Sequence, residues 1–324
     1  MATIEQLTRC RYSSARQDLL KDNAFYEHNN KLFFTEKRDG EVGFNFEVED
    51  ILFYGASQYQ DALVLKTKEE GNLLVLDAMT MISDNSERWY HEFMAHVPLF
   101  LHQSLYPRSQ NVLILGGGDG GIVRETLKHS SVHKIVQCDI DELVTRLTEK
   151  YFPQLTTGIN DSKVELVFDD AKNFLNNSTD KFDIVFYDLC DPNVGPTEGM
   201  FADEIFQKTY GLMNPGGMLV MQSESPIRNK QWLEEMQNVL KDQFVIVAPY
   251  QYPMPIYPGG IWSALLCIKE HPNDNLKDPS DVFISLQQQK DISLHHYNAR
   301  THKAGFLSMN SYFENGKRVE YRGL

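Results

Sequence analysis

Short aliphatic runs alternate with segments of helical spacing over the central part of the chain. Five such runs lie at residues 111–115, 134–138, 164–168, 182–187 and 217–221. Strands that alternate with helices in this way are typical of crossover units around a parallel sheet. We therefore expect a doubly wound α/β domain over residues 106–270, and in such domains ligands bind beyond the carboxyl ends of the strands.

The first third of the chain has a different pattern, which predicts antiparallel strands. Phe44, Phe46 and Val48 alternate with polar or small residues, and the segment 62–78 places two aliphatic arms around a Glu-Gly-Asn turn. Alternation and a central turn indicate half-buried strands joined as a hairpin. We expect a small antiparallel β domain that, with a linking helix, occupies residues 1–105.

The linking helix is predicted from "SDNSERWYHEFMAHVPLFLH", residues 83–102. Asp84 or Ser86 can cap its start, and Pro98 is expected to bend or end it. Its apolar positions follow helical spacing at Tyr90, Met94, Val97 and Leu101. At the other end of the chain, the polar stretch that starts at residue 271 opens a C-terminal extension, 271–324, which we expect to pack on the central domain.

Acidic or amide residues follow every one of the five predicted strands. They are Asp119, Asp139 with Asp141, Asp169 with Asp170, Asp188 with Asp191, and Gln222 with Glu224. A single acid after a strand is usually a helix cap or a turn former. Several acids at the same edge of a sheet predict instead a negative pocket that is stabilised by a cation or by bound protons.

The glycine-rich loop "GGGDGG", residues 116–121, narrows the chemistry of that pocket. Gly116, Gly118 and Gly121 satisfy the dinucleotide pattern GxGxxG, which is weak by itself. Asp139 lies about 20 residues further on, where an acid commonly binds ribose hydroxyls. Asp119 would repel a pyrophosphate but would hold an amine through a charge-assisted hydrogen bond. The loop therefore favours a nucleoside that carries positive charge.

The composition agrees with a cationic ligand. The chain has 324 residues, 42% of them hydrophobic and 23% charged, which suffices for one large domain or two ordinary ones. Its formal net charge of −14 disfavours nucleic acid as a partner. The same charge also serves solubility, so it does not identify the ligand alone.

The cysteines and the start of the chain give expectations about metal and location. The four cysteines lie far apart without a CxxC pair, and His295, His296 and His302 lack metal-ligand spacing, so we expect no metal site. Cys190, which stands between two acids, is expected to be unreactive. Nothing near residue 1 resembles a secretory signal, and no run could span a bilayer. We expect a cytoplasmic protein with no membrane partner.

Eight stretches of this sequence resemble the polyamine aminopropyltransferases, the family of the spermidine synthases. They are "SQYQD" (57–61), "GNLLVLDA" (71–78), "WYHEFMAHVPLF" (89–100), "GGGDGG" (116–121), "QCDID" (137–141), "LVFDDAKNF" (166–174), "YDLCDPNVGP" (187–196) and "PIYPGG" (255–260). They occur in the family's order over roughly residues 40–270. The resemblance implies a methyltransferase-like, Rossmann-type parallel-rich sheet beside the N-terminal antiparallel domain, and a homodimer or homotetramer formed through that domain.

The resemblance also implies a reaction: transfer of the aminopropyl group of decarboxylated S-adenosylmethionine to an amine, usually putrescine, which gives spermidine and methylthioadenosine. The donor is then a co-substrate and no cofactor is expected. Gln60 and Asp139 would hold its nucleoside, and Asp119 would bind its primary amine. Further donor contacts are implied for Gly116, Gly118, Asp170, the Ala171 backbone and Pro196. Ordinary S-adenosylmethionine adds a carboxylate that Asp119 would oppose.

On the acceptor side, Asp188 matches the family's catalytic acid. It would orient the attacking nitrogen and take up its proton as the carbon–nitrogen bond forms, with Tyr90 or a water passing the proton on. The residues implied around the acceptor are Tyr90, His91, Asp119, Asp188, Asp191 and Tyr257. Asp191 and Glu224 are expected to face its far ammonium, and Trp89 and Trp262 to exclude water.

The sequence departs from the family's usual pattern at two of these places. Asp139 stands where many members have a glutamate, and "DPNVGP" is one residue longer than the commoner loop, which affects Pro196 most. "DLCDP", "DDAKNF", "HHYNA" and "EYRGL" resemble thermospermine synthases instead, so a thermospermine or spermine synthase that uses spermidine is an alternative. Two alternatives from other classes are a non-catalytic polyamine-binding protein and a nicotinamide-dependent oxidoreductase.

Overall fold

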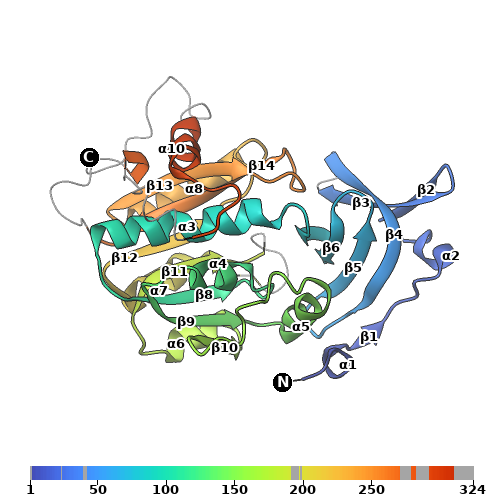
Figure 1. The fold of residues 1–324 in the computed structure, drawn as a ribbon, viewed down its shortest axis with the longest axis horizontal. Coiled ribbons are helices and arrows are strands. Elements are labelled where there is room, and N and C mark those ends of the chain that lie inside the picture. The colour runs from blue at the N-terminus through green and yellow to red at the C-terminus, as the bar shows by residue number, and fades with distance from the viewer. Residues whose placement is uncertain are drawn as a thin grey trace.

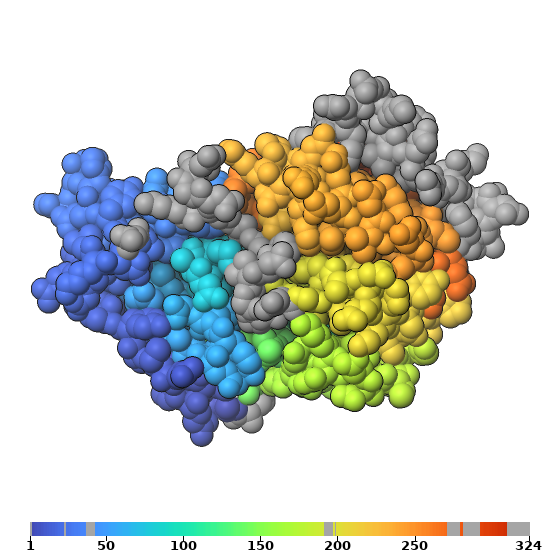
Figure 2. Space-filling view, turned by 180° about the vertical axis from the view of Figure 1, so that it is seen from behind, coloured from blue at the N-terminus to red at the C-terminus, as the bar shows by residue number. Residues whose placement is uncertain are grey.

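The computed structural model describes residues 2–22, 24–38, 42–190, 197, 199–270, 279–281 and 292–309. Two seven-stranded sheets lie side by side, and helices cover the C-terminal one on both faces (Figure 1). In the space-filling view from behind, the N-terminal residues form one lobe and the rest of the described chain forms the other (Figure 2). Among the described residues no helix combines the length and the apolar character needed to cross a membrane.

The N-terminal sheet is antiparallel throughout and runs in the order β2-β3-β4-β5-β6-β7, with β1 added against β4. Its strands are β1 Cys10–Arg11, β2 Phe25–His28, β3 Lys31–Arg38, β4 Val42–Ala56, β5 Asp61–Thr67, β6 Gly71–Leu76 and β7 Met79–Ser83. The predicted hairpin is formed by β5 and β6, which are paired from Ala62 opposite Leu76 to Thr67 opposite Gly71.

The C-terminal sheet has the order β10-β9-β8-β11-β12-β14-β13. Its strands are β8 Gln110–Gly116, β9 Val132–Asp139, β10 Val164–Phe168, β11 Phe182–Asp188, β12 Met213–Gln222, β13 Ile246–Pro253 and β14 Ile261–Ile268. The first five in the order pair in parallel and are the five predicted strands, whereas β14 is antiparallel to both of its neighbours. The expected fold class, a Rossmann-like sheet with an antiparallel N-terminal domain, is confirmed.

Helices form a layer on each face of this sheet. The helices of the described residues are α1 Ile4–Leu7, α2 Arg16–Leu19, α3 Glu87–Leu105, α4 Gly121–Leu127, α5 Glu142–Tyr151, α6 Ala171–Asn177, α7 Asp203–Leu212, α8 Lys230–Lys241 and α10 Ala299–Ser308, with a 3₁₀ turn, η2, at Pro279–Asp281. Helices α1 and α2 lie beside the N-terminal sheet instead (Figure 1). Helices α3, α4 and α10 share one hydrophobic core, and α6, α7 and α8 share the core of the opposite face.

Helix α3 joins the two domains, and most of its residues are buried. Pro98 lies inside it and does not end it, because the helix continues to Leu105. Ser86 occupies the capping position, but its hydroxyl donates to Glu70 and does not cap the helix. Since α3 packs along the C-terminal sheet and its core continues into the N-terminal sheet, side chains at its start face both domains.

Helix α5 packs on the N-terminal sheet. Leu143 and Leu147 share a third core with Val64 and Leu74 of β5 and β6. The Tyr151 hydroxyl donates to the Leu52 carbonyl at 2.9 Å, so polar contacts add to the apolar ones. A helix of the C-terminal domain thus holds the N-terminal sheet close to the carboxyl edge of the Rossmann-like sheet.

Candidate active site

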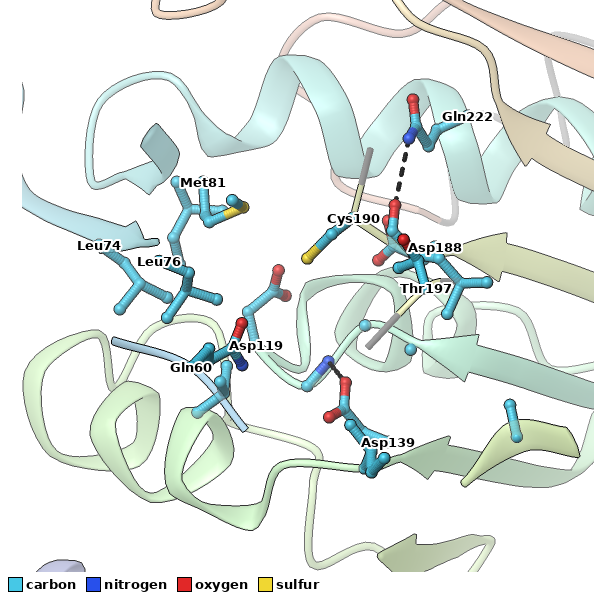
Figure 3. Close-up of a pocket in the computed structure, with 18 of the residues that line it drawn as sticks. Gln60, Leu74, Leu76, Met81, Asp119, Asp139, Asp188, Cys190, Thr197 and Gln222 are labelled. Atoms are coloured by element: carbon cyan, nitrogen blue, oxygen red, sulfur yellow. Dashed lines mark hydrogen bonds between the residues drawn. The ribbon is translucent and has the colours of Figure 1, made fainter. Parts of the chain in front are cut away.

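One cavity lies at the carboxyl edge of the C-terminal sheet, between that edge and the N-terminal domain. Its walls come from both domains, and Figure 3 shows Leu74, Leu76 and Met81 across the cavity from Asp188 and Cys190. Ten of the predicted site residues line it: Gln60, Tyr90, Gly116, Gly118, Asp119, Asp139, Asp170, Ala171, Asp188 and Tyr257. The strand-end acids therefore converge, as the topology of parallel strands requires.

The glycine loop makes room for carboxylates. Gly116 has a φ of 82°, and a Cβ there would lie 2.1 Å from the Asp188 carbonyl oxygen. A Cβ on Gly118 would lie 2.8 Å from the side chain of Asp139. These glycines let β8 pass directly against the ends of β11 and β9, which brings the two acids to the same cavity.

The N–H groups of this loop are already bonded within the protein. The Gly117 N–H donates to the Asp188 carbonyl and the Gly118 N–H to the Asp139 carboxylate, each at 3.0 Å. The N–H of Gly121 donates to Asp119 Oδ1 at 2.6 Å. A dinucleotide fingerprint needs such N–H groups for its pyrophosphate. Because oxygens of the protein already accept from these N–H groups, the oxidoreductase alternative is disfavoured.

Asp139 lies partly buried at the end of β9 and is held by backbone donors. Its carboxylate accepts from the N–H groups of Gly118 at 3.0 Å and Asp141 at 2.8 Å. Burial, together with the charge of Asp141, raises the pKa of Asp139 to about 6, although these two hydrogen bonds act in the other direction. The fixed carboxylate is suited to accept hydrogen bonds from a hydroxylated ligand.

Asp188 and Tyr90 form a pair at the centre of the cavity. The Tyr90 hydroxyl donates to Asp188 Oδ1. Burial and the nearby charge of Asp119 raise the pKa of Asp188 to about 7, although the Tyr90 hydrogen bond opposes the change. Burial and the charge of Asp188 raise the pKa of Tyr90 well above its ordinary value, so the phenol remains a hydrogen-bond donor. A carboxyl that titrates near neutrality can exchange protons with a ligand.

Three aromatic rings close the side of the cavity next to Asp188. Tyr257 lies edge-on to Trp262, with ring centroids 4.6 Å apart, and edge-on to Tyr90 at 6.2 Å. The Tyr257 hydroxyl donates to the Met81 carbonyl at 2.6 Å, which ties the loop before β14 to β7 of the N-terminal domain. Aromatic faces beside carboxylates favour a cationic ligand with an apolar stem.

Sequence reasoning missed the apolar wall that the N-terminal domain contributes. Leu74 and Leu76 of β6 and Met81 and Ile82 of β7 all line the cavity. The run "LLVLDAMTMI" in the sequence is apolar on both strand faces, which was a signal that both faces are covered. Gln222, whose amide donates to the Leu189 carbonyl at 3.1 Å, and Cys190 also line the cavity (Figure 3).

His91 is not at the cavity surface, which corrects its predicted place in the acceptor channel. It is fully buried on the far side of Asp119, where its Nε2 lies 3.3 Å from Asp119 Oδ1. Residue 91 lies next to Tyr90 in the helix, and successive helical side chains point about 100° apart, so only one of the two faces the cavity.

Other expected ligand contacts also lie elsewhere. Glu224 is only 2% exposed and is not among the described residues that line the cavity. Trp89 stacks on His296, with ring centroids 3.6 Å apart, and does not line it either. Asp191 and Pro196 lie outside the described residues.

The acids Asp141 and Asp170 both cap helices, as single acids after strands commonly do. Asp141 accepts from the Leu143 N–H of α5, and Asp170 from the Lys172 N–H of α6. Asp141 also accepts from Gln60 Nε2 at 2.9 Å, which orients that amide at the cavity wall. In the part of the chain that the structure describes, no cluster of three or more His, Cys, Asp or Glu side chains is arranged to hold a metal ion.

Fold and site together define a Rossmann-like α/β protein with an acid-lined cavity that it shares with an antiparallel domain. Comparison with known proteins identifies the family. Residues 87–278 match the spermine/spermidine synthase domain, and residues 32–84 match the spermidine synthase tetramerisation domain. The chain belongs to the spermine/spermidine synthase family, the polyamine aminopropyltransferases.

Individual relatives agree over most of their length. The polyamine aminopropyltransferase of Methanocaldococcus jannaschii is 36% identical over 278 residues, which cover 86% of this chain and 92% of the relative. That of Caldicellulosiruptor bescii is 34% identical over 276 residues, 85% of this chain and 95% of the relative.

Solved structures of spermidine synthases share the fold. A spermidine synthase in complex with the transition-state analogue AdoDATO superimposes with a TM-score of 0.77 at 31% identity, covering 85% of this chain and 91% of the other. The spermidine synthase of Thermotoga maritima gives a TM-score of 0.76 at 29% identity, over 90% and 95% of the two chains.

Proposed function

We propose that this protein transfers the aminopropyl group of decarboxylated S-adenosylmethionine to putrescine, giving spermidine and methylthioadenosine. The observation that carries the proposal is the convergence of Asp119, Asp139 and Asp188 on one cavity that apolar and aromatic side chains also line. Such a cavity favours a sulfonium nucleoside and a diamine, because both present cations on apolar stems. Family membership supports the same reaction class.

In this proposal the donor occupies the side of the cavity next to the glycine loop. Asp139 accepts hydrogen bonds from the ribose, while Asp170 and the Ala171 backbone face the adenine. Asp119 binds the primary amine of the aminopropyl group, and Gln60 contacts the nucleoside. A carboxylate on the ligand next to that amine would face Asp119, so the decarboxylated donor is preferred to ordinary S-adenosylmethionine.

The acceptor amine reaches the reaction beside Asp188 and Tyr90. An alkyl ammonium has a pKa near 10.4, so an ordinary aspartate is a poor base for it. The pKa of Asp188 is raised to about 7, which brings it closer to the pKa of the ammonium and makes Asp188 a stronger base than an ordinary aspartate. A bound ammonium lowers this pKa again, so substrate binding and ionisation of Asp188 are coupled.

The transfer is a direct displacement. The nitrogen lone pair of putrescine forms a bond to the aminopropyl carbon that is attached to the sulfonium sulfur. The bond between that carbon and sulfur breaks, and its electron pair stays on sulfur in neutral methylthioadenosine. Asp188 takes up the proton that the acceptor nitrogen gives up as the new bond forms, and Tyr90 keeps the carboxylate oriented. Alignment of nitrogen, carbon and sulfur is the main task, since the sulfonium is already a good leaving group.

Product analysis with several acceptors tests the proposal. The protein is incubated with decarboxylated S-adenosylmethionine and, separately, with putrescine, cadaverine or spermidine, and the products are identified by mass. We expect spermidine from putrescine at the highest rate, with one methylthioadenosine released per transfer. A higher rate with spermidine would instead make the protein a thermospermine or spermine synthase.

Ordinary S-adenosylmethionine serves as the matched control, because it differs from the donor by one carboxylate. We expect no transfer product with it. Binding of putrescine without any release of methylthioadenosine would overturn the proposal in favour of a non-catalytic polyamine-binding protein.

A further inference from the structure

A chain of alternating charges runs from Asp119 away from the cavity into the core between α3 and α4. His91 Nε2 lies 3.3 Å from Asp119 Oδ1, and His91 Nδ1 lies 2.7 Å from Glu87 Oε2. Both oxygens of Glu87 accept from Arg124, through Nη1 and Nη2, each at 2.8 Å. His91, Glu87 and Arg124 are 0%, 1% and 7% exposed, so water contributes little to solvating these charges.

The imidazole of His91 is fixed sterically as well as by its polar contacts. Its ring lies where a side chain on Gly121 would be, since a Cβ there would come within 2.2 Å of the ring. Tyr90 lies edge-on to it, with ring centroids 5.4 Å apart. The ring is therefore held with Nδ1 hydrogen-bonded to Glu87 and Nε2 within ion-pair distance of Asp119.

The polar groups around His91 are Glu87 and the Tyr90 hydroxyl on α3, Asp119 on the glycine loop, Arg124 on α4 beyond Glu87, and Asp188 at the end of β11. The carboxylates among them favour the protonated form of His91, and Arg124 is separated from the ring by Glu87. Burial by itself lowers the pKa of His91, but Asp119 and Glu87 outweigh it and raise this pKa to about 10. Arg124 in turn helps to keep Glu87 ionised, with a pKa of about 2.

We propose that Glu87 and Arg124 are positioning residues that hold His91 as a permanent imidazolium behind Asp119, so that Asp188 stays a carboxylate beside the charge of Asp119. The inference deepens the proposed function and rests on it, because Asp119 and Asp188 are assigned there to the two amines. No atom of Glu87 or Arg124 lines the cavity, so their effect is exerted through His91.

The physical need for this cation follows from the crowding of acids. The charge of Asp119 raises the pKa of Asp188, and the charge of His91 lowers it. Without the imidazolium, the charge of Asp119 would act on Asp188 without an opposing cation, and the pKa of Asp188 would be higher. Asp188 would then be protonated over more of the neutral range and unable to accept the proton of the acceptor amine.

The substitution Glu87→Gln tests the proposal, because it keeps the size of the side chain and removes the anion that pairs with His91. Nitrogen NMR of the imidazole is expected to show wild-type His91 as an imidazolium from about pH 6 to about pH 9. In Glu87→Gln the same signals should titrate within that range. The acid limb of kcat/KM should move upward by about one pH unit, with kcat at high pH reduced less than about threefold.

Glu92→Gln is the matched control. Glu92 is also a buried acid of α3, but its oxygens accept from the backbone N–H groups of His295, His296 and Tyr297 and do not touch His91. We expect this variant to lose stability without moving the acid limb. An equal shift of the limb in both variants, or unshifted profiles in both, would overturn the proposal and leave Glu87 a purely structural role.

The NMR measurement on the wild-type protein needs neither turnover nor a folded variant. If wild-type His91 titrates near pH 6.5, the ordinary value for histidine, the inference fails whatever the reaction is. If instead no acceptor yields methylthioadenosine, the proposed function fails while the His91 signals still report its charge state. The two failures are thus distinguishable.

Discussion

The residues around Asp188 determine its pKa and its orientation. It is an ordinary aspartate at the end of a buried strand, but burial and the proximity of Asp119 give it a pKa near neutrality, while Tyr90 fixes its orientation. A group that must be a carboxylate when the acceptor amine loses its proton therefore changes state within the physiological pH range.

The first prediction concerns pH. The carboxylate form of Asp188 is needed, and its pKa is about 7, so kcat/KM for putrescine should rise as pH increases through about 7 and fall on the acid side. Asp139, with a pKa of about 6, becomes protonated at lower pH and should weaken donor binding there. Initial rates from pH 5.5 to 9 at subsaturating putrescine measure this; a flat profile across that range would contradict it.

Removing the charge of Asp188 gives a second prediction. Asp188→Asn should lower kcat/KM about 10²–10⁴-fold, because the proton of the acceptor amine then has no nearby base. Binding of methylthioadenosine, measured by calorimetry, should change little. Asp169→Asn is the control, since Asp169 also follows a strand but is exposed and does not line the cavity; its activity should remain within about twofold.

At the scale of single residues, the sequence was sufficient to predict that the acids lie together. It was not sufficient to predict which buried residues contact them. Asp119, Asp139 and Asp188 could be placed together because the ends of parallel strands share an edge. The burial of His91 could not be predicted, since it depends on how α3 packs against α4, where the His91 ring occupies the space beside Gly121.

The glycine loop is the element that brings the acids together, and a third prediction tests it. Gly116→Ala should destabilise the protein by about 3 kcal/mol, because a φ of 82° strains any side chain and the new Cβ would meet the Asp188 carbonyl. Urea unfolding measures the effect. Gly211→Ala is the control: this glycine lies in α7 with nothing within 4 Å of a new Cβ, so alanine there should be neutral or stabilising by up to about 1 kcal/mol.

The prediction of strands succeeded where the apolar pattern of the segment itself indicates a strand. It failed where the position of the strand in the sheet determines which residues are tolerated. The five parallel strands and the β5–β6 hairpin follow from their own apolar patterns. Strands β13 and β14 were missed, partly because Pro249 and Pro253 interrupt β13 and proline usually argues against a strand. The structure explains the exception, because among the described strands β13 lies at the edge of the sheet and pairs with β14 alone.

At the scale of the whole molecule, the match of residues 32–84 to a tetramerisation domain leads to a fourth prediction. The protein of 37.3 kDa should sediment as a homo-oligomer, with a tetramer of roughly four times that mass as the expected species. Analytical ultracentrifugation over a range of protein concentrations measures this. A monomer at micromolar concentration would show that this domain does not assemble here.

The cavity is shared between the two domains, and this has a practical consequence. Gln60, Leu74 and Met81 precede residue 85 in the sequence, and every strand-end carboxylate that lines the cavity follows it. Two fragments separated at that point would each carry half of a binding surface. Recovered affinity for methylthioadenosine would then report that the fragments had reassociated, so the active site itself could serve as a sensor of contact between them.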